Sequence, residues 1–380
     1  MQEVVVLGGG VGGILVADLL ARRLTNQQAN ITVITDSDQH YFQPGQLYVP
    51  FDKIETRSLK RLVRGLLDKR ANLIHQRVVG LDHEDQWVKL ESGKELHYDY
   101  LVIATGCALR PDLIPNLAET GHHFFSLGEA MLLRSQLKRF EGGRIVVGSA
   151  SVPHKYPLGN FEFVFLLEEY LAQRGLKDVS EIVFVHPEKE PHKIESAARI
   201  IRKLFDRRGI KFFPEYRIRG VNPDEKFIIS RGGSKVTYDL LVMTPPNRGV
   251  DFLQGHPIAD RDGFVRVLPR TLQVKDADYT WAIGDATNLA VSKEASAAHF
   301  EARAVAEQIE AEIRGSIPNK KKAEYRGHVV SFLETGYGEA TILNYTRREQ
   351  PEIALPSEGI QLLKQGYIKS YWRLLTQGLI

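Results

Sequence analysis

The chain has 380 residues, 43% of them hydrophobic and 26% charged, so it can bury a large core and is long enough for two or more domains. Its net charge of +3 is too small to favour nucleic acid, and no helix-turn-helix, zinc-finger or RNA-binding signature accompanies it. The single cysteine, Cys107, excludes an intramolecular disulfide, an internal dithiol relay and a thiol-only metal site, and we expect no metal. The first apolar strand begins almost at Met1 without a signal-peptide pattern, which predicts a cytoplasmic protein.

A glycine-rich turn lies near the start of the chain. Residues 4–24, VVVLGGGVGGILVADLLARRL, place Gly8, Gly10 and Gly13 between an apolar strand and an apolar-periodic helix. A Cβ at the first glycine would block the tight turn, one at the second would keep a pyrophosphate from the backbone, and one at the third would separate helix from sheet. The next strand, ITVIT, ends at Asp36, whose carboxylate can accept ribose hydroxyl groups. This pattern predicts a dinucleotide-binding βαβ unit.

Strands and helices alternate along the rest of the chain. An aromatic loop (40–51) precedes a basic amphipathic helix (58–70) and strands near 73–82, 87–92 and 96–106. A second βαβ pattern starts at 142–155 and continues with helix 161–175, strand 181–187, helix 195–209 and strands near 210–218, 227–232, 235–246 and 279–289. We therefore expect an α/β fold with two Rossmann-like domains. Residues 1–115 with 236–312 would form the first domain, 116–235 the second, and 313–380 a C-terminal region.

The second glycine fingerprint is altered. The segment GSASVP keeps Gly148 but has Ala150 and Pro153 where the other two glycines would stand, and both changes crowd a phosphate turn. The following strand ends in His186 and Pro187 instead of a ribose-binding acid. The second domain is therefore predicted to keep its shape without binding NAD(P).

The C-terminal segment 362–380 has the pattern of an amphipathic helix and contains no apolar run long enough to span a membrane. Its apolar stripe comprises Leu363, Tyr367, Tyr371, Leu374, Trp372, Leu375, Leu379 and Ile380, with Lys364, Lys369 and Arg373 expected on the other side or flank. Tyrosine, tryptophan and basic residues together suit the headgroup boundary of a membrane. The alternative is a helix docked on the protein itself or on a second subunit of a homo-oligomer.

Two later motifs add to the first glycine turn. YLVIATG ends in Thr105 and Gly106, and YTWAIGD ends in Gly284 and Asp285. The three motifs in this order resemble the flavoprotein reductases with two dinucleotide domains, which implies bound FAD with the aspartate on its ribityl and pyrophosphate side. An alternative role for Asp285 is the N-cap of a following helix.

Further segments resemble the sulfide:quinone oxidoreductase family over the whole chain. They include YFQPGQLYVPF, VPHKYPLGNFEFVFLL, YDLLVMTPPNRG and GHVVSFLETGYGEATILNY. This resemblance implies FAD, a quinone acceptor that enters from the membrane side, and Pro44 near the flavin; Val79 is also assigned to the cofactor site. Because the aromatic loop has no cysteine for attachment, we expect the FAD to be non-covalent.

The chain departs from that family at the sulfur site. The resemblance implies two redox cysteines, but Tyr156 and Ser331 stand at those positions, and neither hydroxyl can form a persulfide. The resemblance also places Lys293 near the flavin ring and quinone, and Glu162 and His299 in the same pocket. A lysine there would stabilise reduced flavin, and the other two could supply quinone protons. Their alternative roles are a charged residue at a helix start for Glu162 and a solvated helix residue for His299.

Three functional hypotheses follow. The first is an FAD oxidoreductase of the sulfide:quinone oxidoreductase type on the inner face of the cell membrane, which passes electrons to quinone from a donor that needs no cysteine pair, or from sulfide by an altered path. The second is a flavin-binding paralogue that acts as a partner or scaffold. A type II NADH:quinone dehydrogenase is disfavoured by the altered second fingerprint.

Overall fold

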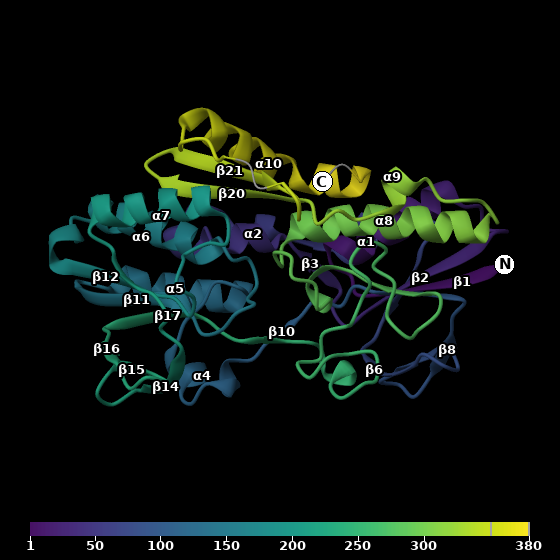
Figure 1. The fold of residues 1–380 in the computed structure, drawn as a ribbon, viewed down its shortest axis with the longest axis horizontal. Helices are drawn as coiled ribbons and strands as arrows, with labels where there is room; N and C mark the ends of the chain where they lie inside the picture. The colour runs from purple at the N-terminus through teal and green to yellow at the C-terminus, as the bar shows by residue number, and fades with distance from the viewer. Residues whose placement is uncertain (350–351, 379–380) are drawn as a thin grey trace.

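Two α/β units lie side by side, and the C-terminal hairpin and helix run across the top of both (Figure 1). The computed structural model describes residues 1–349 and 352–378. The expected fold of two Rossmann-like units is confirmed, because each unit has its own parallel sheet with a small antiparallel sheet inserted between its strands.

The first unit is built on a five-stranded parallel sheet. Its strand order is β19-β9-β1-β2-β5. The bounds are β1 (Gln2–Leu7), β2 (Ala29–Thr35), β5 (Asn72–His75), β9 (Tyr100–Ile103) and β19 (Thr280–Ala282). Helices α1 (Val11–Arg23) and α8 (Ala295–Ile313) pack against each other on this sheet. The antiparallel sheet contains β6 (Val78–Asp82), β7 (Trp87–Leu90) and β8 (Glu95–His97). The apolar runs of β1 and β9 are buried on both faces, as expected for inner strands of a parallel sheet.

The second unit repeats this layout. Its parallel sheet has the order β13-β12-β11-β17 and consists of β11 (Gly143–Ser149), β12 (Ser180–Val185), β13 (Lys211–Phe213) and β17 (Leu240–Thr244). Its long helices are α5 (Leu127–Arg139), α6 (Gly159–Gln173) and α7 (Glu195–Arg208). Its antiparallel sheet consists of β14 (Ile218–Asn222), β15 (Phe227–Ser230) and β16 (Lys235–Thr237). The short strands β10 (Ala108–Leu109) and β18 (Asn247–Arg248) pair where the chain passes between the units.

Two sequence expectations need correction here. The second unit extends to Thr244, past the expected boundary at residue 235, because β17 pairs with β11. A buried apolar strand would fit either parallel sheet, so its sequence does not show which sheet it joins. The basic segment 58–70 is not one helix: β4 (Lys60–Leu62) pairs with β3 (Gln39–Tyr41), and only the short α3 (Val63–Leu66) follows. Gly65 weakens a helix there.

The C-terminal region consists of a hairpin and a long helix. Strands β20 (Val329–Gly336) and β21 (Glu339–Tyr345) pair antiparallel, and α10 (Glu358–Gln377) follows. The remaining helices are short: α2 (Gln43–Gln46), α4 (Leu117–Thr120) and α9 (Lys320–Ala323). Within residues 1–349 and 352–378, no helix combines the length and the apolar character needed to cross a membrane.

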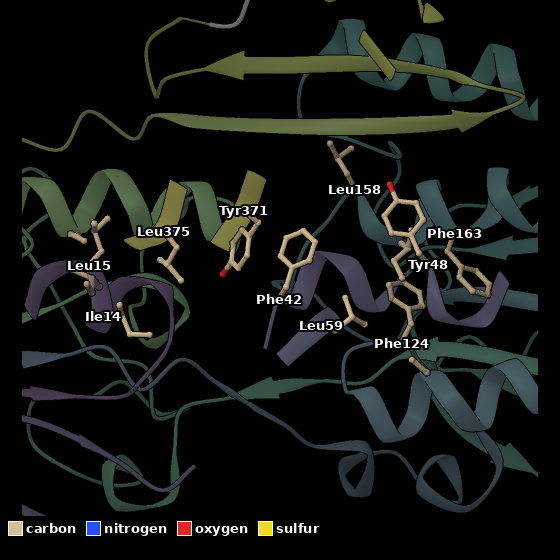
Figure 2. Close-up of a cluster of buried hydrophobic side chains, with 14 of the residues drawn as sticks. Ile14, Leu15, Phe42, Tyr48, Leu59, Phe124, Leu158, Phe163, Tyr371 and Leu375 are labelled. Atoms are coloured by element: carbon tan, nitrogen blue, oxygen red, sulfur yellow. The ribbon is translucent and has the colours of Figure 1, made fainter. Parts of the chain in front are cut away.

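One face of α10 docks on the protein. Figure 2 shows Tyr371 and Leu375 directed into the core, with Tyr371 facing Phe42 at a ring-centroid distance of 4.2 Å. The expected arrangement at the start of this helix is wrong, because Leu363 is exposed whereas Lys364 is buried. Lys364 turns inward because it meets buried carboxylates, as described below. Leu379 and Ile380 lie outside the described residues.

Candidate cofactor and active site

A cavity of about 610 Å³ extends from the first glycine turn to the C-terminal hairpin and helix. Its walls are the turn between β1 and α1, the aromatic loop after β2, the ends of β9 and β19, the segment before α6, and parts of β20 and α10. This volume is within the range of cofactor and small-molecule sites, roughly 300–1,000 Å³.

The glycine turn has the geometry that the sequence predicts. Gly8 has φ +110°, and a Cβ there would lie 2.3 Å from the carbonyl oxygen of Ala104. A Cβ on Gly13 would lie 1.9 Å from the carbonyl oxygen of Gly8, so this glycine is needed for close packing of helix and strand. Gly10 lines the cavity, and a Cβ there would meet nothing within 4 Å. The backbone is therefore open to a ligand at this point.

Most of the predicted cofactor residues line this cavity. They are Gly8, Gly10, Asp36, Pro44, Thr105, Gly106, Gly284 and Asp285. The Thr105 Oγ1 atom is buried and has no hydrogen-bond partner among the described residues, so a polar ligand in the cavity could supply one. Val79 does not line the cavity. It lies in β6 with its side chain 46% exposed, because the chain leaves the parallel sheet after β5.

Two lysines surround Asp285. Lys155 Nζ lies 3.3 Å from Asp285 Oδ2, and Lys293 Nζ donates to the backbone carbonyls of Asp285 (2.9 Å) and Thr287 (2.8 Å). Burial lowers the pKa of Lys293, although Asp285 acts in the opposite direction. Helix α8 begins only at Ala295, so Asp285 is not its N-cap. The Asp285 carboxylate is therefore paired with the Lys155 ammonium group at the cavity wall, and Lys293 holds the backbone around it.

Cys107 lies beside the same carboxylate, with Sγ 3.9 Å from Asp285 Oδ2. Burial, and next the Asp285 charge, raise the pKa of the thiol to about 11. The thiol is therefore protonated near neutral pH and is a poor nucleophile.

Tyr156 and Glu162 belong to a buried polar cluster. Tyr156 has φ +46° and its hydroxyl donates to Glu162 Oε2 at 2.8 Å. Glu162 forms an ion pair with Lys364 of α10, whose Nζ also lies 3.5 Å from Glu334 Oε2. The Tyr48 hydroxyl donates to Glu334 at 2.6 Å. Two carboxyl groups thus share one ammonium group in the protein interior.

The cause of the Glu162 pKa shift follows from this arrangement. Burial raises the pKa of Glu162, Lys364 opposes the increase, and Glu334 adds to it. Glu162 does lie in the first turn of α6, as its alternative role predicts, and its side chain is also buried within the polar cluster. Because burial disfavours the ionised form of Glu162, this carboxyl group can hold and exchange a proton.

Ser331 and Glu294 form a second hydroxyl–carboxyl pair on the cavity wall. Ser331 Oγ donates to Glu294 Oε2 at 2.6 Å, and both residues line the cavity. Burial raises the pKa of Glu294 to about 7. The family resemblance implies a cysteine at positions 156 and 331. Each of these positions carries a hydroxyl group that is hydrogen-bonded to a carboxyl group.

His299 is buried on α8 but does not line the cavity, although its neighbours Ala298 and Phe300 do. Burial lowers its pKa to about 4, and Nδ1 has no hydrogen-bond partner in the part of the chain that the structure describes. The solvated alternative is therefore wrong, and the structure does not bring His299 together with the other predicted residues.

The aromatic loop contributes a residue that the sequence analysis missed. His40 Nδ1 lies 2.9 Å from the carbonyl oxygen of Gly9, and its Nε2 lies 2.8 Å from the Tyr371 hydroxyl. Glu294, Glu334, Tyr48 and Lys364 were missed as well. Burial of Lys364 opposite Glu162 depends on contacts between distant segments, so no local pattern indicated it.

Side chains occupy the end of β11 in the second unit. Asn160 Nδ2 donates to Ser149 Oγ (2.8 Å) and to the Gly148 carbonyl (3.2 Å), and Thr244 Oγ1 donates to Asn160 Oδ1 (2.8 Å). His186 is buried after β12, where burial lowers its pKa to about 3. In the described part of the chain, no group of three or more His, Cys, Asp or Glu side chains is arranged to hold a metal ion.

Comparison with known proteins identifies the family. The profile of the family "Pyridine nucleotide-disulphide oxidoreductase" matches residues 2–302, and the chain belongs to this family. It is therefore an oxidoreductase by family.

Individual relatives show which members of this family the chain resembles. The chain is 26% identical to mitochondrial sulfide:quinone oxidoreductase of Mus musculus over 395 residues, covering 99% of this chain and 86% of that protein. It is 28% identical to sulfide-quinone reductase of Aquifex aeolicus over 240 residues, covering 59% of this chain and 53% of that protein. These relatives confirm the predicted resemblance to sulfide:quinone oxidoreductases.

Solved structures confirm the fold. The sulfide:quinone oxidoreductase of Aquifex aeolicus superposes with a TM-score of 0.88 at 21% identity, covering 100% of this chain and 92% of that chain. NDH2 of Plasmodium falciparum, solved with NADH, gives a TM-score of 0.72 at 14% identity, covering 100% and 97%. At these identities the two likenesses concern the fold alone.

Proposed function

We propose that the protein is an FAD-dependent oxidoreductase that passes electrons from a reduced donor to a quinone without a cysteine relay. The observation that carries this proposal is a single cavity that joins the glycine turn, the Asp285 region and the wall formed by Tyr156 and Ser331. The relatives named for sulfide and quinone support the acceptor class.

The cavity residues fit FAD. Gly8 and Gly10 leave room for a pyrophosphate, Asp36 can accept ribose hydroxyl groups, and the unpartnered Thr105 hydroxyl can bond a ligand. Bound there, FAD supplies two-electron redox chemistry. The aromatic loop offers no cysteine for attachment, so the cofactor is held by non-covalent contacts.

The protein contributes charge and protons. Lys293 lines the cavity, where its ammonium group can stabilise negative charge that develops on bound flavin, and the Tyr156–Glu162 pair can bind or release a proton at the cavity wall. The filled end of β11 supports the proposal that NAD(P)H is not the donor, because side chains occupy the place where a nucleotide would approach this inner strand. Tyr156 and Ser331 cannot form a persulfide, so sulfide would need another route.

The membrane role is part of the proposal. Leu362 and Leu363 are exposed at the start of α10, next to the part of this helix that lines the cavity. Peripheral attachment of this end to the inner face of the cell membrane would bring the cavity close to the quinone pool. The described face of α10 around Tyr371 docks on this chain, so membrane contact would involve the exposed face alone.

Flavin spectroscopy under anaerobic conditions tests the function. The purified protein is loaded with FAD and mixed with sulfide, polysulfide, NADH or NADPH, and a short-chain quinone is added after bleaching. Flavin reduction by a donor other than the nicotinamides, followed by reoxidation by quinone, is the expected result. Failure of every donor would contradict the proposal and favour a flavin-binding scaffold. That alternative is supported by the lack of a cysteine at positions 156 and 331. Rapid bleaching by NADH would instead indicate a nicotinamide dehydrogenase.

A further inference from the structure

Glu294 is a carboxyl group in the cavity wall that is not used to cap a helix. It occupies the N-cap position of α8, but its side chain makes no capping hydrogen bond. Its Oε2 instead accepts the Ser331 hydroxyl at 2.6 Å. The half-buried side chain lines the same cavity as Asp285 and Lys293, the residues expected at the cofactor. Its geometry therefore points to a role within the cavity.

The groups that face Glu294 leave it without a strong counter-charge. Lys293, its neighbour in sequence, directs its ammonium group to two backbone carbonyls. The Asp285 carboxylate acts on Glu294 at longer range and raises its pKa, whereas hydrogen bonds from Ser292 and Ser331 lower it. The other titratable groups that interact with it are the phenols of Tyr156, Tyr325, Tyr345 and Tyr367. Burial raises the pKa values of these phenols, so they remain neutral near pH 7.

We propose that Glu294, positioned by Ser331, takes up a proton when the bound flavin is reduced and releases it on reoxidation. Two electrons that enter the cavity from a reductant add negative charge near the carboxylate, and this charge favours the protonated carboxyl group. The proton comes from water and binds a carboxylate oxygen of Glu294. Because burial places the pKa of this group at about 7, the change in protonation falls within an accessible pH range.

This inference rests on FAD binding in the proposed function, and it can be tested without knowing the natural donor. FAD-loaded protein is photoreduced with a deazaflavin catalyst in weak buffer, and a pH-indicator dye reports the protons taken up between pH 5.5 and 8.5. We expect Glu294→Gln to take up fewer protons than the wild type, by up to one per flavin, with the largest loss near pH 7. Equal uptake by the two proteins at every pH would overturn the inference.

A second variant covers the case in which Glu294→Gln does not hold FAD. Ser331→Ala keeps the carboxyl group and removes a hydrogen bond that lowers its pKa, so the pH of maximal uptake should rise. Carbon-13 NMR of labelled glutamate carboxyl groups should show the Glu294 titration moving to higher pH in this variant. An unchanged titration and unchanged uptake would contradict the inference.

Asp18→Asn is the matched control. Asp18 is also a buried carboxyl group with a raised pKa, but it lies on α1 and bonds the backbone N–H of Asp68, outside the cavity lining. Its removal should leave proton uptake on photoreduction unchanged. A protein that binds no FAD contradicts the proposed function and this inference together. FAD-loaded protein in which Glu294→Gln leaves uptake unchanged contradicts this inference alone.

Discussion

Lys364 in α10 forms a buried ion pair with Glu162 in α6, although 202 positions separate the two residues in the chain. The same ammonium group lies 3.5 Å from Glu334 in β20. The Lys364 side chain therefore links the C-terminal helix to both the hairpin and the second unit, and it lines the cavity.

Lys364→Met should lower the free energy of unfolding by about 3 kcal/mol, because it leaves two buried carboxyl groups without their cation. Urea titration followed by circular dichroism measures this loss. Lys369→Met is the matched control, since Lys369 is exposed on the same helix and its loss should change stability by less than about 0.5 kcal/mol. Equal stability of the two variants would show that the ion pair contributes nothing.

Gly8→Ala should abolish FAD binding and lower the free energy of unfolding by more than about 1 kcal/mol, because alanine is strained at φ +110° and its Cβ would collide with the Ala104 carbonyl. Flavin absorbance of the purified variant and urea titration give the two readouts. Gly128→Ala, in α5 with open space around the Cβ position, should instead be neutral or stabilising by up to about 1 kcal/mol. Retention of FAD by Gly8→Ala would exclude the glycine turn as the binding site.

Asp18 should make stability fall as pH rises from about 4 to 6. Burial raises its pKa from 3.8 to about 6, so the folded state binds the proton more tightly than the unfolded state in this window. Its contribution is fully present below the unfolded pKa and is lost as pH rises through the folded pKa, about 3 kcal/mol for a shift of roughly two units. The stability of the wild type minus that of Asp18→Asn should therefore fall by most of this amount between pH 4 and 7. A difference that does not vary with pH would contradict the assignment.

Cys107 should react slowly with thiol reagents in the folded protein. Raising its pKa to about 11 reduces the thiolate fraction at pH 8 about 100-fold, and the greater nucleophilicity of a more basic thiolate recovers roughly tenfold of this. We therefore expect labelling by Ellman's reagent to be at least about tenfold slower in the folded chain than in urea. Equal rates would show that the thiol is neither buried nor perturbed by Asp285.

Local sequence patterns were sufficient to predict the residues of the expected cofactor side of the site. Gly8 and Gly13 are fixed by a turn between adjacent elements, and Asp285 lies in the short turn that follows β19. Lys364 was assigned to the polar flank because its burial depends on Glu162 and Glu334, which no helical periodicity reveals.

The remaining misassignments have the same origin. β17 has the apolar run of any buried strand, so its membership of the second sheet depends on pairing with β11. Val79 is not at the cofactor site, because the chain turns away from the first sheet after His75 and enters the antiparallel sheet. The sequence did not indicate Glu294 as a site residue, because its place in the site depends on the hydrogen bond from Ser331, in a strand that follows α8. Interactions between distant segments therefore determine the part of the site that the sequence does not show.

Asn160→Ala tests whether the side chains at the end of β11 keep a nucleotide out of the second unit. The amide of Asn160 bonds Ser149, the Gly148 carbonyl and Thr244, so its removal leaves buried polar groups without partners. We expect a loss of about 2 kcal/mol in the free energy of unfolding, measured by urea titration. Asn319→Ala is the control, because Asn319 caps the short exposed helix α9 and its loss should cost at most about 1 kcal/mol.

NADH should still fail to bleach the flavin of Asn160→Ala, because Ala150 and Pro153 continue to crowd the turn. Bleaching by NADH in this variant alone would show that the Asn160 network, and not the altered turn, keeps the nucleotide out.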